Sequence, residues 1–376
     1  MTPAELSRTV LHAVCRAVED GVLPAPAPES VLVERPGPGG CGDYATNVAL
    51  RLAGAAGRPP RAVAETLKER IGRNPAIAAV EITGPGFLNI TLAEGAQRAL
   101  IRTVLEQGPG YGQPAAAHRT HESHRAAEVR PEAGPDAEAG PEAVAGPEVG
   151  PAAAARRAAE AGPGPGADSA EEPRARLWNL TVDRLRRTQT AAARTAAHAG
   201  TRAAAPAAPH ADARPAPAPA PPYDPALGAD AVRWAMLSVA AHDRPRIGPE
   251  LLRQHESNPL FTVRYAHSRT RALTRGARLL GFAAEPGEYV DTPLTGLIAD
   301  YPGVLASAAR LRAPDRLARH LESTADAVLG LQHTVLPIGD EKPTAAHRSR
   351  LAIAEAAGTV LAGGLSLLGV SAPEHL

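Results

Sequence analysis

The chain has 376 residues, in which 40 lysine and arginine side chains balance 40 aspartate and glutamate side chains. The balance also holds within residues 1–112, 113–221 and 222–376, so no global field steers the chain to nucleic acid or to a membrane surface. Any site for a polyanion must therefore be a local patch of charge.

The cysteine content and the hydropathy indicate a cytoplasmic protein. Cys15 and Cys41 are the two cysteines, and they show no metal-ligand spacing, so neither a metal site nor a disulfide is expected. No apolar run approaches the roughly 20 residues of a membrane span. Acidic residues near the N-terminus, at Glu5, Glu19 and Asp20, also argue against a signal peptide. We expect no membrane partner.

The first 112 residues alternate between helical and extended patterns. Leu6, Val10 and Val14 recur every four residues and predict an amphipathic helix, whereas Phe87–Leu92 alternates with period two, as in a half-buried strand. The patterns predict helices at 3–21, 43–53 (with Asp43 as its cap) and 59–72, and strands at 31–36, 79–82 and 87–92. This mixture predicts a small α/β domain.

Three motifs in this region follow one another as in a known family. They are Gly42-Asp43-Tyr44-Ala45-Thr46-Asn47, the proline-led helix at 59–72, and the run from Val80 to Ile90. Together they resemble the N-terminal additional domain of bacterial arginyl-tRNA synthetases. The resemblance implies a domain at 1–112 that grips the D-loop corner of a tRNA.

The resemblance also implies a D-loop site. It places Phe87 and Asn89 against a D-loop base, with Asn47 as a further contact. The chemistry agrees, because an aromatic ring stacks on a splayed base and an amide reads its edge. The alternative is that Phe87 belongs to the core and that Asn89 is a polar residue facing a turn.

Residues 113–222 have the composition of a linker. Residues 126–168 are mostly Ala, Gly, Pro and Glu, and residues 203–222 are mostly Ala and Pro. Such segments bury too little apolar surface to offset chain entropy, so we expect a disordered, low-complexity linker. Residues 177–187 differ, because they have helical spacing and include Trp178. They form either a docking helix or a transient helix within the linker.

The chain lacks the sequence motifs of an active site that binds ATP. A class I synthetase needs a His-x-Gly-His helix start on the phosphates of ATP and a lysine-bearing loop. The chain has no His-x-Gly-His, and its lysines are Lys68 and Lys342 alone. The glycine-rich residues 37–42 lack the spacing of a phosphate loop, and His118, His121 and His124 lack a second ligand set. We expect no catalytic residue, no cofactor, no ATP site and no metal.

A basic helix is predicted to begin at Asn258-Pro259, since proline has no N–H to lose at the first helical position. At about 100° per residue, four of its arginines share an arc of roughly 60°. The opposite side suits a core. The arginines are Arg264, Arg271, Arg275 and Arg278, and the core side carries Phe261, Tyr265, Ala272, Leu273 and Leu280. The basic face is either a solvated surface or a surface that meets phosphates.

The last third of the chain resembles a second module of the same family. Ala229–Leu237 resembles the Asp-Ala-x-Arg-Tyr helix that opens the DALR anticodon-binding module, and Glu256–Arg269 resembles its most recognisable run. Helical patterns at 292–300, 302–312, 314–333 and 344–368 predict an all-α bundle within residues 223–376. The expected fold is thus a small α/β domain and an all-α bundle joined by a disordered linker.

In that family the module faces the anticodon arm. The resemblance makes seven side chains candidates for contact: Arg264, Tyr265, His267, Arg269, Arg271, Arg275 and Arg278. Thr262 and Arg264 stand where the family has a second aromatic and a glutamine, so we expect these side chains to grip phosphates more than to read bases.

The leading functional hypothesis is a non-catalytic tRNA-binding paralogue of arginyl-tRNA synthetase, with tRNA-Arg as its expected partner. Two alternatives stay open. Under the first, the chain is a subunit of a split arginine–tRNA ligase, and a separate catalytic chain docks on Trp178 or on the bundle. Under the second, it is a degenerate protein–protein interaction module. In each case we expect the chain alone to be inactive as a ligase.

Overall fold

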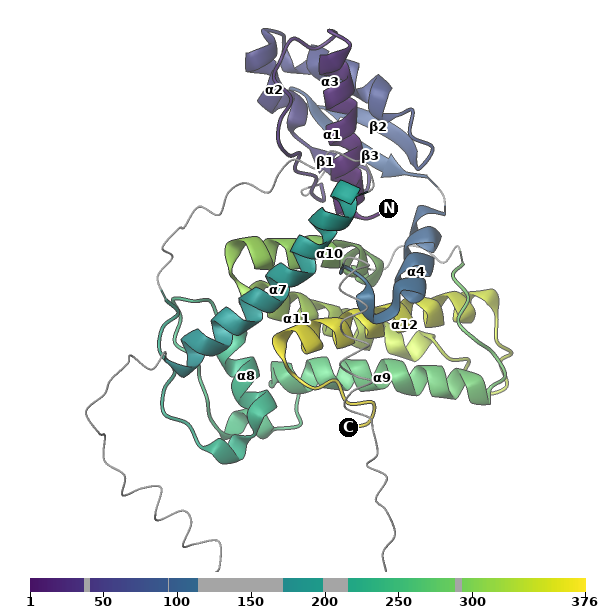
Figure 1. The fold of residues 1–376 in the computed structure, drawn as a ribbon. Helices are drawn as coiled ribbons and strands as arrows, with labels where there is room; N and C mark the ends of the chain where they lie inside the picture. The colour runs from purple at the N-terminus through teal and green to yellow at the C-terminus, as the bar shows by residue number, and fades with distance from the viewer. Residues whose placement is uncertain (37–40, 94, 114–171, 199–215, 288–292) are drawn as a thin grey trace, which may run out of the picture.

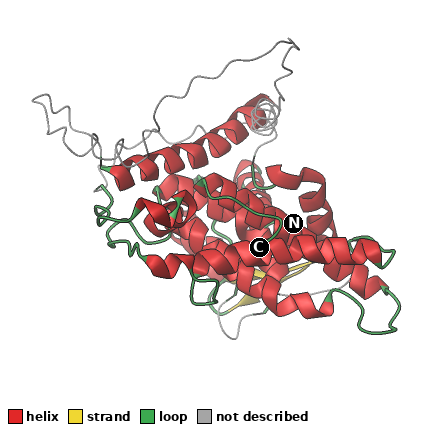
Figure 2. Cartoon of the chain, turned by 90° about the horizontal axis from the view of Figure 1, so that it is seen from below, coloured by secondary structure: helices red, strands yellow, loops and turns green. Residues whose placement is uncertain are grey.

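A computed structural model describes residues 1–36, 41–93, 95–113, 172–198, 216–287 and 293–376. A small domain with a sheet lies above a helical body in Figure 1, and Figure 2 shows that helices dominate the rest of the chain. Each part is built around its own group of buried apolar side chains. The predicted fold class, a small α/β domain with an all-α bundle, is confirmed.

The N-terminal domain packs three helices on one face of a three-stranded antiparallel sheet of order β1-β3-β2. Leu88 and Ile90 of the central strand are fully buried under the helices, and Phe87 and Asn89 alternate onto the other face. The elements are α1 (Pro3–Glu19), β1 (Tyr44–Thr46), α2 (Val48–Ala56), α3 (Pro60–Ile71), β2 (Ile77–Thr83) and β3 (Phe87–Leu92).

Two local predictions for this domain are wrong. Residues 31–36 form no strand beyond a single bridge between Glu34 and Ala45. Asp43 does not cap a helix, because Tyr44–Thr46 is extended and pairs with β3. The Asp43 carboxylate instead accepts a hydrogen bond of 2.7 Å from the backbone N–H of Leu92. Pairing with a strand more than 40 residues later outweighs the local helical pattern, and α2 therefore begins only at Val48.

The helix α4 (Ala96–Gln107) was not predicted, and it belongs to the helical body. Its apolar side chains Leu100, Ile101 and Val104 are buried in the core of that body, and the helix packs against α12. The two cores therefore meet near residues 92–95, whereas the sequence pattern placed the boundary of the first domain at residue 112.

The helical body surrounds α12 (Ala345–Leu368) with α8 (Ala229–Leu237), α9 (Pro259–Leu279), α10 (Pro293–Leu311) and α11 (Pro314–Leu331). Short 3-10 turns lie at Gly108–Gly110, Pro225–Leu227, Pro249–Leu252 and Gln332–Thr334. The two helices predicted at 292–300 and 302–312 are one helix, because α10 continues through Pro302. By length and composition α12 is able to cross a membrane, but 78% of its apolar window is buried, as in the core helix of a soluble protein.

The segment around Trp178 is a docking helix, which settles one of the open alternatives. It forms α7 (Pro173–His198), which crosses the helical body and packs against α8, α10, α11 and α12 (Figure 1). Trp178, Val182 and Leu185 are buried in the shared core. The rest of the expected linker falls mainly on residues 114–171 and 199–215, which lie outside the described residues.

The two parts of the molecule touch directly. Arg35 of the N-terminal domain lies 3.5 Å from the carboxylate of Asp300 on α10, and α1 also packs on α10. Tyr111 donates a hydrogen bond of 3.0 Å from its hydroxyl to the carbonyl oxygen of Ile298, which anchors the end of the N-terminal segment in the helical body. The N-terminal domain and the helical body, which carry the two expected tRNA-contacting surfaces, are thus joined by direct packing as well as by the chain.

Candidate nucleic-acid interface

The three D-loop candidates lie together at one end of the open sheet face. Phe87 begins β3 and is 42% exposed. The register pairs Thr46 with Leu88, so the exposed Asn47, which follows Thr46, lies opposite Phe87. Asn89 is 4% exposed, and its Nδ2 donates a hydrogen bond of 2.8 Å to the Thr83 hydroxyl. The ring is therefore presented to solvent, while the Asn89 amide is held in a fixed orientation.

Two side chains beside these candidates were not found from the sequence. Glu81 pairs with Asn89 across β2 and β3, and the Cys41 thiol donates a hydrogen bond of 3.2 Å to Glu81 Oε2. The hydrogen bond to Glu81 raises the pKa of the Cys41 thiol, which keeps it protonated. Period-two alternation along β2 is the signal that places Glu81 on this face. The open face thus combines a ring, amides and a carboxylate acceptor.

The face that α9 turns to the core agrees with the prediction at Leu273 and differs at the other predicted positions. The buried side chains include Leu260, Val263, Ala266, Leu273 and Ala277, because α11 and α12 pack on this side. Phe261 and Tyr265 were expected in the core, but they are only half-buried and stack on each other with ring centroids 5.5 Å apart. Leu280 was also expected in the core and is 51% exposed, just beyond the end of the helix.

The C-terminal tail, residues 369–376, lies along α9 and contacts four of the seven candidates. Arg264 donates from Nη2 to the Ser371 hydroxyl at 3.2 Å, and His267 Nδ1 lies 2.9 Å from the Pro373 carbonyl oxygen. Arg271 Nε lies 3.8 Å from a Glu374 carboxylate oxygen, and Arg275 Nη2 lies 3.4 Å from His375 Nδ1. No sequence pattern had indicated this arrangement.

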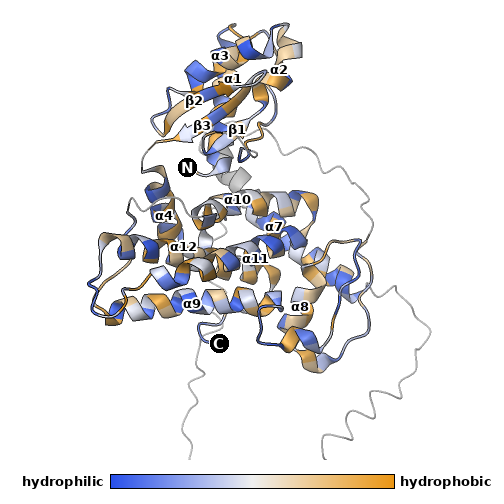
Figure 3. Cartoon of the chain, turned by 180° about the vertical axis from the view of Figure 1, so that it is seen from behind, coloured by the Kyte–Doolittle hydropathy of each residue, from blue (hydrophilic) through white to orange (hydrophobic). Residues whose placement is uncertain are grey.

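The other three candidates face different surroundings. Arg269 donates a hydrogen bond of 2.8 Å from Nε to the Gln332 side chain. Tyr265 is half-buried in its stack with Phe261, and Arg278 is exposed near the end of α9. Figure 3 shows how hydrophilic and hydrophobic segments alternate along the helix. The arginines of α9 run from Arg264 to Arg278, and three of them contact the tail.

Two of the side chains on α9 are not available as positive charges or as base readers. Burial lowers the pKa of His267, with the hydrogen bond to Pro373 opposing the shift, so the ring is neutral near pH 7. Thr262 is 9% exposed, and its hydroxyl points to the carbonyl oxygens of Asn258 and Glu256. Both residues hold the helix and its neighbours rather than facing a ligand.

A pocket of about 470 Å³ opens beside the first turns of α9. Leu251 and Leu260 contribute apolar walls, Phe261 contributes a ring, and Asp230 and Arg264 contribute charges. A pocket of this size with apolar walls and a few polar groups is of the kind that holds a small molecule or a group of that size. Among the described residues, no cluster of His, Cys, Asp and Glu is placed to hold a metal ion.

Comparison with known proteins gives one family match near each end of the chain. Residues 5–92 match the family model of the arginyl tRNA synthetase N terminal domain, and residues 263–376 match that of the DALR anticodon binding domain. The chain is an arginyl-tRNA synthetase-like protein. In this arginyl-tRNA synthetase-like chain, α7, α8 and the first turn of α9 lie between the two matched ranges.

Relatives of the arginyl-tRNA synthetase-like chain are similar to it over limited stretches. The arginine–tRNA ligase of Frankia alni is 51% identical over 115 residues, which are 31% of this chain and 21% of the ligase. That of Pseudarthrobacter chlorophenolicus is 38% identical over 168 residues, 40% of this chain and 30% of the ligase. The chain thus spans less than a third of these relatives. Thermus thermophilus arginyl-tRNA synthetase shares the fold, with a TM-score of 0.53 at 14% identity and full coverage of both chains.

Proposed function

We propose that this chain binds tRNA, with tRNA-Arg as the expected ligand, and does not charge it. The observation that carries the proposal is the presence, in one chain, of a match to the synthetase N-terminal domain and a match to the anticodon binding domain. The N-terminal domain would hold the D-loop corner, and the helical body would hold the anticodon arm of the same molecule.

The open sheet face supports the first contact. The exposed ring of Phe87 offers a stacking platform for an unstacked base, and Asn47 lies beside it. The Asn89 amide is 4% exposed and bonded to Thr83, so it would hold the strand beside the ring rather than offer an open amide to a base. A platform of this kind recognises single-stranded loops of RNA rather than a regular duplex.

The arginines of α9 support the second contact. The Arg271 side chain is 51% exposed despite its contact with Glu374, and Arg278 is exposed. Because Thr262 is turned toward backbone carbonyls, we propose that the helix contacts phosphates and that base recognition, where it occurs, uses the pocket beside Phe261. Phosphate contacts would position the tRNA without specifying its anticodon.

The proposal that the chain carries out no ligation rests on sequence motifs. It contains no His-x-Gly-His, and its two lysines, Lys68 and Lys342, lie in the N-terminal domain and after α11 rather than in a loop over a nucleotide. We therefore propose that the chain has no ATP site and that it acts in the cytoplasm as a tRNA-binding protein. A separate synthetase core is a partner only under the split-ligase alternative, and Trp178 is too buried, at 3% exposed, to dock it.

A second candidate function is an interaction module that no longer binds tRNA. The C-terminal tail favours it, because the tail occupies Arg264, His267, Arg271 and Arg275 on the face expected to meet the anticodon arm. Under this function the tail would be a permanent cover, and its acid Glu374 would neutralise part of the basic face.

A filter-binding titration with tRNA-Arg tests the two functions. Binding at low salt that weakens steeply as salt rises is expected for phosphate contacts, since each neutralised phosphate adds roughly 0.7–0.9 to the slope of log K against log salt. Absence of binding even at low salt would leave the interaction module. ATP-dependent arginylation by the chain alone would contradict the proposal that it carries no active site.

A further inference from the structure

We infer that α7 carries a third RNA-contacting surface, which binds the phosphodiester backbone of the same tRNA. The inference rests on the proposed function and adds to it a surface outside both matched ranges. The first observation is charge: the last fifteen residues of α7, 184–198, contain four arginines and no acidic residue, in a chain whose net charge is zero.

The N-terminal half of α7 is anchored so firmly that the helix is a rigid platform. Arg174 is fully buried and donates hydrogen bonds to five backbone carbonyl groups. Trp178 lies against Arg174 and donates from Nε1 to the carbonyl oxygen of Arg312 at 2.9 Å. Because these contacts fix the helix on the body, its outer side chains have a constant position relative to α9.

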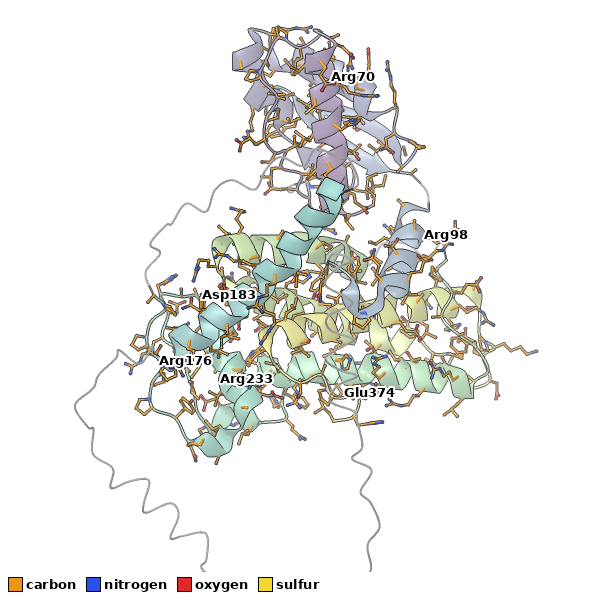
Figure 4. The ribbon with its side chains drawn as sticks, in the orientation of Figure 1. Arg70, Arg98, Arg176, Asp183, Arg233 and Glu374 are labelled. Carbon is orange, nitrogen blue, oxygen red and sulfur yellow. The ribbon has the colours of Figure 1, made fainter. Side chains whose placement is uncertain are left out.

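The outer face of α7 is basic and exposed. Arg176, Arg186 and Arg187 are exposed, together with Leu180 at 58% and the acid Asp183. In Figure 4, Arg176 and Asp183 lie along α7 on the side of the body that also carries Arg233 of α8. Arginine is the side chain best suited to phosphate groups, since its planar fork donates two parallel hydrogen bonds.

The end of α12 joins this face to α9. Arg184 of α7 donates to the Leu367 carbonyl oxygen at 2.7 Å, and Arg233 of α8 donates to that of Gly369 at 2.9 Å. Arg264 of α9 donates to Ser371, two residues further along the same turn. Three arginines from three helices thus meet over residues 367–371, and Asp230 is the acid that the described contacts place beside them.

The arginines that meet over residues 367–371 repel one another electrostatically. Burial lowers the pKa of Arg184, and the neighbouring charges of Arg233 and Arg187 lower it further. A polyanion that lay along α7 and reached α9 would relieve this repulsion with its phosphates. RNA backbone fits better than a protein partner, because its repeated phosphates match arginines that three neighbouring helices, α7, α8 and α9, contribute to one side of the body.

The test compares paired glutamine variants of the full chain in tRNA-Arg titrations at several salt concentrations. R186Q/R187Q is expected to lower the salt slope by about 2 and to weaken binding by about 10- to 100-fold near 0.1 M salt. R186K/R187K should retain the slope, because it retains the charge. R16Q/R73Q, which removes two exposed arginines from the helical side of the N-terminal domain, is the matched control.

The outcomes separate this inference from the function on which it rests. If R271Q/R278Q on α9 weakens binding while R186Q/R187Q behaves as R16Q/R73Q does, the third surface is wrong and the proposed function stands. If the wild-type chain binds no tRNA at low salt, both are wrong. Hydroxyl-radical footprints of the bound tRNA add a positional readout: R186Q/R187Q should lose protection at phosphates other than those that R271Q/R278Q loses.

Discussion

The imidazole Nδ1 of His267 lies 2.9 Å from the carbonyl oxygen of Pro373, and this contact ties the C-terminal tail to α9. The Ser268 hydroxyl repeats the link one residue later, through the carbonyl oxygen of Glu374 at 3.1 Å. The tail therefore sets how much positive charge α9 presents, because its own carboxylate lies beside Arg271.

Replacing Glu374 by Gln should strengthen tRNA binding. The substitution removes the acid that lies 3.8 Å from Arg271 and leaves the backbone contacts of the tail in place. We expect an affinity gain of about 2- to 10-fold at low salt and a salt slope steeper by up to about 1. Stability should hardly change, because an exposed ion pair contributes about 0–1 kcal/mol. The control is E69Q on α3, and equal behaviour of the two variants would show that the tail does not mask α9.

Replacing Phe87 by Ala should weaken tRNA binding without unfolding the domain. Stacking of one base on an aromatic ring contributes about 1–3 kcal/mol, so the dissociation constant should rise roughly 5- to 150-fold. Filter binding measures the loss, and thermal unfolding checks the fold. V22A removes a side chain of similar exposure (43% against 42%) and should bind as the wild type does. A normal affinity for F87A would remove the D-loop contact from the proposal.

Replacing Arg174 by Met should destabilise the helical body strongly. The substitution leaves five carbonyl groups without the donor that joins them to α7, in a place where the side chain is fully buried. We expect the free energy of unfolding to fall by about 3–5 kcal/mol. R176M makes the same change at an exposed position two residues away, on the opposite side of the helix, and should cost about 0.5 kcal/mol or less. Urea unfolding followed by tryptophan fluorescence measures both.

The stability of the helical body should fall as the pH drops below about 6.5. Burial lowers the pKa of His320 from 6.5 to about 4, while a backbone hydrogen bond with Leu297 opposes the shift. The unfolded state therefore binds more protons between these two values, and about 3 kcal/mol of unfolding free energy should be lost between them. His267, whose pKa is also lowered, adds in the same direction.

Urea unfolding at a series of pH values between about 7 and 4 tests this expectation. In H320Q the loss between pH 6.5 and 4 should be smaller than in the wild type by about 3 kcal/mol, since glutamine takes up no proton. H12Q, at an exposed position on α1, is the matched control and should keep the wild-type profile. An unchanged profile in H320Q would mean that another group carries the acid sensitivity.

Local patterns in the sequence determined a large part of this structure. Period-four apolar residues predicted α1, period-two alternation predicted β3, and Asn258-Pro259 marked the start of α9. In these elements the spacing of apolar residues within one segment already shows which face is buried. They can therefore be predicted without knowing which distant segment packs on them. The motifs around Phe87 and His267 also carried the resemblance that the two family matches support.

Only the tertiary structure decided what depends on partners far along the chain. Tyr44–Thr46 is a strand because β3 pairs with it, and α7 docks because Trp178 finds a core built from later helices. The tail covers α9 through contacts about 100 residues apart in sequence, which no local period encodes. The sequence by itself was therefore enough to predict the basic helix α9. The fold decided which of its arginines lie beside the tail.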